Sequence, residues 1–282
     1  MTGKNIFELI SSQYFQLTNS EKKVADYLLH HGGEAQYMSI SELAEVCTVA
    51  DATISRFCRR LGVGGYNAFK LELAKATLAA GASGEKSAAG ESGCDGLCAR
   101  LVRENAAVLE QTAQLLDPAQ VQRALELMAE ARRVVCMGQG GCMIMAQEAW
   151  SMFSMLSPKF TFVPDCHLQM NTTALMDEED VIFFCSYSGS IRDLQDILEV
   201  ARGKKVKVIL LTRFPKSPAG QRADVVLQCG ANESPLHAGS ATARMAQLFV
   251  LEVLFQHMAE ADPKRAEANR EVLAQAAERK HV

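Results

Sequence analysis

Two short segments rich in glycine and serine have the residue types that bind anionic groups. The first is Gly138-Gln139-Gly140-Gly141-Cys142 and the second is Ser186-Tyr187-Ser188-Gly189-Ser190, and each follows an apolar run. Glycine lets the backbone approach a ligand closely, and a helix that begins at such a loop directs free N–H groups at an anion. Two loops converging on one crevice would suit a small phosphorylated molecule. The residues that we expect to contact it are Gly138, Gly140, Gly141, Cys142, Ser186, Ser188, Gly189 and Ser190.

Other interpretations of these loops match the residues less well. Gly138-x-Gly140 begins a dinucleotide-binding fingerprint, and Asp165 could bind the ribose, but Met143 stands where the third glycine belongs. Ser188-Gly189 does not complete the Gly-x-Ser-x-Gly motif of hydrolases, because other residues occupy the preceding places. Either loop could also do no more than cap a helix.

A second group of residues with chemical character lies on a predicted helix that ends at Gly62. Residues 53–75 hold five cations and a single acid, Glu72, although the whole chain has a net charge of −4. One face of this helix is apolar at the spacing of a buried stripe, with Ile54, Phe57, Cys58 and Leu61. The opposite face carries Ala52, Thr53, Ser55, Arg56, Arg59 and Arg60.

These side chains suit the major groove of DNA. Arginine bonds guanine through two hydrogen bonds, and short hydroxyls reach bases or phosphates. We therefore expect DNA contacts from Thr53, Ser55, Arg56, Arg59 and Arg60. The alternative is a helical interaction module whose basic face is only solvated.

The elements around this helix are all predicted to be helical. Thr18-Asn19-Ser20-Glu21 and Ser39-Ile40-Ser41-Glu42 are capping boxes that open two helices. Two short helices with a tight connection lie between Ile40 and Leu61, which is the pattern of a helix-turn-helix. We predict an all-α helix-turn-helix domain over residues 1–78. Residues 79–96 are dominated by small side chains, which predicts a flexible linker.

The rest of the chain, residues 97–282, alternates β-rich runs with helices. The predicted strands are 133–137, 160–163, 181–185, 206–211 and 225–227. Continuous apolar strands of this kind predict an α/β domain with a parallel sheet covered on both faces. In such a sheet ligands bind at the carboxyl ends of the strands, where both glycine- and serine-rich loops fall. Helices are expected again over 237–259 and 263–280.

Composition sets further limits on the class of protein. The 282 residues suggest two domains. The nine cysteines are scattered and include no metal-finger spacing, so we expect reduced thiols, no metal site, no cofactor and a cytoplasmic location. Residues 1–10 do not read as a signal peptide. No uncharged apolar stretch approaches the ~20 residues of a membrane span.

Taken together, these features resemble the RpiR-type transcription regulators, which join a helix-turn-helix domain to a SIS (sugar isomerase) domain. The N-terminal resemblance lies in the runs 17–27 and 52–62. The C-terminal resemblance lies in Gly138-x-Gly140, Ser186-Tyr187-Ser188-Gly189, Ser234-Pro235-Leu236 and Arg244-Met245-Ala246-Gln247-Leu248.

The resemblance implies a DNA-binding regulator, not an enzyme, that senses a sugar phosphate or related metabolite in the SIS crevice. It also implies a homodimer or homotetramer that binds a double-stranded operator, with the helices near Leu101–Leu116 and Leu248–Phe255 as candidate pairing surfaces.

Three positions depart from the family pattern. Cys142 and Ile191 stand where the family usually has hydroxyls that bind phosphate, and Thr48 stands where the turn often has glycine. Each lost hydrogen bond to a charged group costs ~1.5–3 kcal/mol, so a standard phosphate would bind more weakly. One alternative is therefore a SIS domain kept only for assembly. Another is an active isomerase with Glu233, His237 or His167 as its general base.

Overall fold

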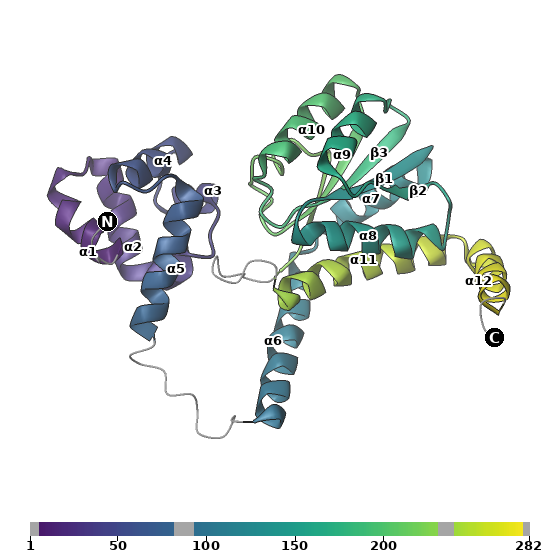
Figure 1. Ribbon diagram of the computed structural model, residues 1–282, viewed down its shortest axis with the longest axis horizontal. Coiled ribbons are helices and arrows are strands. Elements are labelled where there is room, and N and C mark those ends of the chain that lie inside the picture. The colour runs from purple at the N-terminus through teal and green to yellow at the C-terminus, as the bar shows by residue number, and fades with distance from the viewer. Residues whose placement is uncertain (1–5, 82–92, 231–239, 279–282) are drawn as a thin grey trace. The chain divides into compact units, whose positions relative to one another are not determined.

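The computed structural model describes residues 6–81, 93–230 and 240–278 (Figure 1). The described residues form two compact units that divide between Arg103 and Glu104. The first unit contains helices only, and the second contains a five-stranded parallel sheet. The predicted fold class, an all-α domain followed by an α/β domain, is confirmed.

The first unit is built from short helices around one apolar core. Its elements are α1 (Ile6–Gln13), η1 (Tyr14–Gln16), α2 (Asn19–Ala35), α3 (Ile40–Val46), α4 (Asp51–Arg60) and α5 (Tyr66–Gly81). Both predicted capping boxes are present, because Thr18 and Ser39 each accept a hydrogen bond from the backbone N–H three residues later. Phe57 and Phe69 meet edge to face at 6.0 Å in the core. Gly62 follows α4 with φ +77°, as expected of a helix stop.

The turn between α3 and α4 contains a strained residue at the position where the sequence has threonine in place of the usual glycine. Thr48 has φ +55°, in the left-handed region that glycine adopts most easily. The Val49 N–H donates to the carbonyl of Ala44, which closes the turn. The Ser41 hydroxyl donates to Asp51 at 2.8 Å and links the two helices across it.

The second unit is a sheet with strand order β2-β1-β3-β4-β5. Its strands are β1 (Arg133–Gly138), β2 (Phe160–Phe162), β3 (Asp180–Cys185), β4 (Lys207–Thr212) and β5 (Val225–Gln228). Helix α6 (Cys94–Leu115) crosses the boundary between the two units, and its residues from Glu104 on belong to the second. The other helices of the second unit are α7 (Pro118–Glu130), α8 (Gly141–Ser154), α9 (Cys166–Ala174), α10 (Arg192–Gly203), α11 (Ala241–Ala261) and α12 (Pro263–Glu278).

Helices cover both faces of this sheet, as predicted (Figure 1). Cys136 and Phe183 point to the face packed by α7, α8 and α11. Met137 and Phe184, their chain neighbours, point to the face packed by α10. Successive strand residues alternate between two cores, so the interior positions of β1, β3 and β4 are apolar.

The helix ends differ from the predicted linker boundaries. Residues 79–81 belong to α5 and residues 94–96 belong to α6, so both ends of the segment 79–96 are helical. Residues 82–92, between them, lie outside the described residues. The small side chains that suggested a linker, alanine above all, are also good helix formers.

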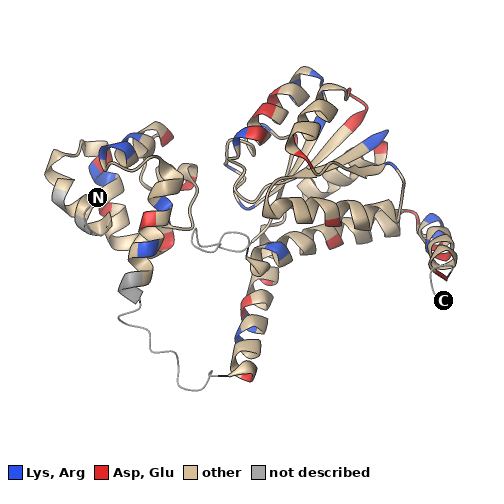
Figure 2. Cartoon of the chain, viewed as in Figure 1, with Lys and Arg blue, Asp and Glu red and all other residues tan. Residues whose placement is uncertain are grey.

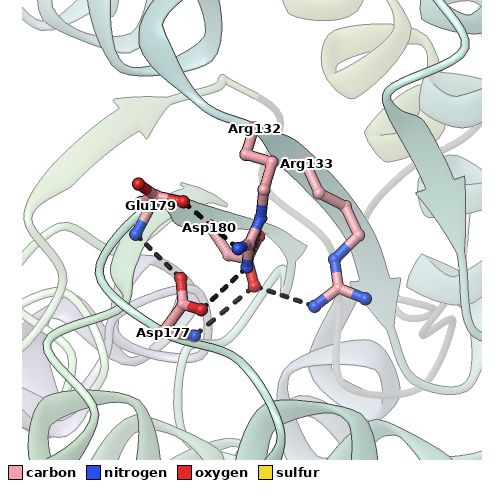
Figure 3. A network of polar contacts seen from close by, with 5 residues as sticks. All are labelled: Arg132, Arg133, Asp177, Glu179 and Asp180. Carbon is pink, nitrogen blue, oxygen red and sulfur yellow. Dashed lines mark hydrogen bonds and ion pairs between the residues drawn. The ribbon is translucent and has the colours of Figure 1, made fainter.

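A network of ion pairs closes the sheet at the amino ends of β1 and β3 (Figure 3). Asp180 is fully buried and accepts hydrogen bonds from Arg132 at 3.0 Å and Arg133 at 2.8 Å. Arg132 also contacts Asp177 at 2.8 Å and Glu179 at 3.1 Å. The Arg132 guanidinium lowers the pKa of the Asp177 carboxyl below its ordinary value. Arg133 and Asp180 are register partners, so the network fixes the alignment of the two strands.

Candidate functional site

The two glycine- and serine-rich loops lie side by side. Strands β1 and β3 are hydrogen-bonded neighbours, and their register pairs Gly138 with Cys185 at the ends where the loops begin. The Sγ of Cys142, in the first turn of α8, accepts a hydrogen bond from the Tyr187 N–H at 3.3 Å. The structure therefore brings the two predicted loops together at the carboxyl end of the sheet.

The hydroxyls of the second loop mainly shape the loop itself. Ser186 is fully buried, and its Oγ accepts the Gly189 N–H at 3.2 Å. The Oγ of Ser188 accepts the Ser190 N–H at 3.3 Å, while the Ser190 hydroxyl donates to the Ser188 carbonyl at 3.1 Å. Ser188 acts here as an acceptor, which leaves its hydroxyl hydrogen for a ligand. Ser186 instead holds the turn.

The segment that begins at the end of β4, residues 212–219, was not predicted from the sequence and holds the second loop in place. Thr212 ends β4, and its hydroxyl donates to the Tyr187 carbonyl at 3.0 Å. The Ala219 N–H donates to the Gly189 carbonyl at 3.0 Å. Gly189 has φ +59°, and a Cβ there would collide with the side chain of Ser217. The signal available in the sequence was that Thr212 directly follows the predicted strand 206–211, at its carboxyl end.

Neither helix that opens at these loops has a side-chain cap among the described residues. The N-cap of α8 is Gly140, with φ +56°, and the N-cap of α10 is Ile191. The first turn of α8 contains no acidic residue, whereas that of α10 contains Asp193. The positive end of α8 is thus the better of the two for a negative charge. Ile191 leaves the N-cap of α10 without the hydroxyl that the family resemblance implies.

Two glutamines that sequence reasoning did not select also border the first loop. Gln169 is fully buried, and its Nε2 donates to the carbonyls of Gly138 and Val163, at 2.9 Å each. Its Oε1 has no partner among the described residues. Gln247, on α11, places its Nε2 3.8 Å from Cys142 Sγ. Gln247 lies within a run that carries the family resemblance, whereas nothing in the local pattern marks Gln169.

The residues considered for dinucleotide binding or for isomerase chemistry do not join the two loops in the described structure. Asp165 is the N-cap of α9, and its carboxylate accepts the Leu168 N–H at 2.9 Å, so it acts as a helix cap. His167 is exposed in the first turn of α9. Glu233 and His237 lie outside the described residues. No group of three His, Cys, Asp or Glu side chains in the described ranges could hold a metal ion.

All nine cysteines lie in the described ranges and are free thiols. Five of them are buried, and burial raises the pKa of Cys136 and of Cys229 to about 12. These buried thiols stay protonated at neutral pH and serve as apolar core residues. Cys142 is half-buried, and three others, Cys94, Cys98 and Cys166, are exposed.

On α4 the structure separates the predicted DNA-contacting residues into two groups. Arg56 and Arg59 are exposed and Ser55 is half-buried, and basic residues, all of them arginines, gather on this helix (Figure 2). Thr53 is only 7% exposed, so its expected place on the open face is wrong. It lies four residues before Phe57, and residues at that spacing share a helix face. The Thr53 hydroxyl instead accepts a hydrogen bond from Arg56 at 3.4 Å.

Arg60 pairs with a residue of α2. Its Nε donates to the buried carboxylate of Glu21 at 3.1 Å, and its guanidinium also reaches the carbonyl of Gln16 at 2.9 Å. Burial raises the pKa of Glu21, but hydrogen bonds from Thr18 and the charge of Arg60 outweigh burial and leave that pKa below its ordinary value. Arg60 thus ties α4 to the helix capped by Thr18.

Comparisons with known proteins match both units. Residues 4–80 match the helix-turn-helix domain of the RpiR family, and residues 127–257 match the SIS domain. An uncharacterized HTH-type transcriptional regulator of Haemophilus influenzae is 30% identical over 89% of this chain and 88% of its own. HexR, an HTH-type transcriptional regulator of Pseudomonas aeruginosa, is 29% identical over 89% of this chain and 88% of its own.

A solved structure shares the whole fold. The NanR protein of Vibrio vulnificus, complexed with ManNAc-6P, superposes with a TM-score of 0.85 at 23% identity, covering 97% of this chain and 98% of its own. The fold and both domain matches define a helix-turn-helix transcription regulator with a SIS domain. The chain belongs to the RpiR family of transcription regulators.

Within the described ranges, no helix is both long enough and apolar enough to span a membrane.

Proposed function

We propose that this regulator binds a sugar phosphate, or a related phosphorylated metabolite, at the carboxyl end of its sheet and changes its affinity for operator DNA in response. The observation that carries the proposal is the contact between Cys142 Sγ and the Tyr187 N–H. It places the start of α8 beside the loop that leads into α10, and no side chain of the described residues caps either helix. Helix N-termini without side-chain caps have free N–H groups that favour binding of a phosphate group.

The ligand class is supported by the fold shared with NanR, whose structure contains ManNAc-6P. In this chain Cys142 and Ile191 supply no hydroxyl, so we propose that the phosphate is bound by backbone N–H groups of Gly140 and Gly141 together with the hydroxyls of Ser188 and Ser190. Each hydroxyl lost to a charged group costs ~1.5–3 kcal/mol, so this chain should bind a given sugar phosphate more weakly than a relative with both.

For DNA we propose that α4 enters the major groove with Arg56, Arg59 and Ser55 toward the bases and phosphates. Arg60 and Thr53 then support DNA binding only indirectly. Arg60 holds α4 against α2 through Glu21, and Thr53 is buried in the core of the helical unit. We propose a homodimer or homotetramer, paired through α6 and α11, that spaces two copies of α4 by one or more helical turns of DNA, ~34–36 Å each. The ligand must favour one arrangement of that oligomer to alter operator affinity.

A second candidate function is a SIS domain that only assembles the regulator. The specific observation in its favour is that the N-caps at Gly140 and Ile191 lack hydroxyls. We propose no catalytic step. Isomerisation needs a base beside the substrate, and the one candidate base within the described residues, His167, is exposed on α9.

The DNA part is tested by titrating fragments from upstream of the chain's own gene, with fluorescence anisotropy as the readout. Arg56→Ala and Arg59→Ala should each weaken binding roughly tenfold or more, since a bidentate base contact is worth about 1–3 kcal/mol. Arg123→Ala, which removes an exposed arginine from α7, is the matched control and should bind normally. Unchanged binding in both α4 variants would overturn the assignment of α4 as the DNA-reading helix.

A further inference from the structure

Two exposed cysteines contact each other at the start of α6. Cys94 and Cys98 are four residues apart, and their sulfurs lie 4.0 Å from each other. Both are free and exposed. Residues at this spacing share one face of a helix, so the helix itself holds the two thiols together. Cys166 is a useful contrast, because it is exposed on α9 and is paired with no other cysteine in the described structure.

Helix geometry limits the reactions open to the two thiols. Cβ atoms four residues apart on an α-helix are ~5–6 Å from each other, whereas a disulfide needs Cβ atoms ~3.8 Å apart, so oxidation would deform the helix. Two thiolates bound to one tetrahedral Zn²⁺ at ~2.3 Å are ~3.8 Å apart, close to the 4.0 Å between Cys94 and Cys98. The two thiols can therefore bind one ion while α6 keeps its helical geometry, which a disulfide would not allow.

We infer that Cys94 and Cys98 form a chelating site for a thiophilic divalent cation, with Zn²⁺ as its representative. On binding, each thiol releases its proton to solvent and donates a sulfur lone pair, so one cation displaces two protons. No third His, Cys, Asp or Glu of the described residues joins the pair. Water, or the same pair from a second copy of the chain, completes the tetrahedron.

This site would act on the exposed first half of α6. Thr112, in the second half of α6, is fully buried, and its hydroxyl accepts the Gly230 N–H at 3.0 Å. In the first half, Leu97, Leu101 and Val102 are all exposed. A cation bridging residues four apart fixes one helical turn, so occupancy would stabilise the start of α6. The proposal is independent of the effector crevice.

The test uses the full-length, reduced protein without a histidine tag. Zn²⁺ is titrated in competition with a chromophoric chelator, and alkylation by iodoacetamide is followed at each cysteine by mass spectrometry. We expect Zn²⁺ to protect Cys94 and Cys98 but not Cys166. Cys94→Ser and Cys98→Ser should each lower the affinity for Zn²⁺ by ~100-fold, because the second thiolate binds intramolecularly. Cys166→Ser is the matched control and should bind as the parent does.

Stoichiometry reports how the site is completed. One Zn²⁺ per chain indicates water, and one per two chains indicates a second copy; both support the chelate. Zn²⁺ affinity that is unchanged in Cys94→Ser and Cys98→Ser, or alkylation of both residues that is unaffected by Zn²⁺, would overturn it. Because both positions are exposed, the folding of each variant is checked by circular dichroism before titration.

Discussion

The two ends of one parallel sheet treat polar groups in opposite ways. At the amino ends of β1 and β3, the buried carboxylate of Asp180 is matched by two arginines, and the chain supplies its own counter-charges. At the carboxyl ends, α8 and α10 begin without side-chain caps in the described structure, and buried Gln169 Oε1 has no partner there. The Nε of Arg133, at the amino end, also has no partner among the described residues, so the uncapped helix starts are what suit the carboxyl end to an anion. The amino end, the paired end, stabilises the fold. The carboxyl end, the open end, is proposed to bind the phosphorylated ligand.

Removing the Asp180 carboxylate should cause the largest loss of stability at the paired end. Asp180→Ala would leave two arginines around a buried gap, and losing one member of a buried ion pair costs about 3–5 kcal/mol. We expect the lower part of that range, because Arg132 and Arg133 are partly exposed. Urea unfolding of the SIS domain measures the loss. Glu178→Ala, which removes an exposed ion pair with Lys205, is the control and should cost under ~1 kcal/mol. Equal losses in both variants would contradict the contrast.

A single substitution at the open end tests its affinity for phosphate. Cys142→Ser restores the hydroxyl that the family resemblance implies, in the first turn of α8. If this end binds phosphate, the variant should bind a sugar phosphate about tenfold more tightly, since a hydrogen bond to a charged group is worth ~1.5–3 kcal/mol. Isothermal titration calorimetry gives the affinity, with Cys166→Ser as a control outside the loops. Weaker binding in Cys142→Ser would show that the thiol serves a different role from the family's hydroxyl.

In the helical unit, the buried carboxylate of Glu21 is paired with Arg60, so we expect the stability of this unit to depend on pH. The pKa of Glu21 is lowered in the folded state, so its contribution is present above the ordinary value of 4.5 and is lost as pH falls below it. Glu21→Gln should therefore be less stable than the parent at pH 7, and the gap should narrow in acid. Urea midpoints of the N-terminal unit at several pH values measure this. Glu72→Gln, which removes an exposed pair with Lys75, is the control and should change the stability at pH 7 by under ~1 kcal/mol.

The smallest effect tests the strained turn before α4. Thr48 is exposed with φ +55°, and a left-handed conformation costs a non-glycine residue about 1–2 kcal/mol. Thr48→Gly removes that strain but gains entropy in the unfolded chain, so we expect a net stabilisation of up to ~1 kcal/mol in thermal unfolding. Thr48→Ala keeps the strain and should give no gain. A destabilised Thr48→Gly would mean that the Thr48 side chain makes a contribution larger than the strain.

Local rules predicted much of the fold. Capping boxes at Thr18 and Ser39 and the helix stop at Gly62 depend on residues only a few positions apart, and all three are present. The strands and both loops at their carboxyl ends also follow from apolar runs that break at glycine and serine. The clearest local error, Thr53 on the open face of α4, ignored its four-residue spacing from Phe57.

The remaining features depend on contacts between distant segments. Arg60 pairs with Glu21, which is 39 residues away in the chain, and no pattern near either residue reveals that pairing. Gln169 reaches the Gly138 carbonyl across 31 residues only because β2 and α9 return the chain beside β1. Thr212 joins the site because β4 lies next to β3. Strand order decides which loops meet, and composition does not determine it.

The open end of the sheet is proposed to bind a phosphorylated sugar. The most direct measurement is a thermal-shift screen of the full-length protein against sugar phosphates, amino-sugar phosphates and the same sugars without phosphate. At 100 times its dissociation constant, a true ligand adds ~2.7 kcal/mol of stability. We predict that a phosphate raises the melting temperature, that its unphosphorylated counterpart does not, and that Ser188→Ala reduces the shift. No shift with any phosphate, or an equal shift in Ser188→Ala, would contradict the account.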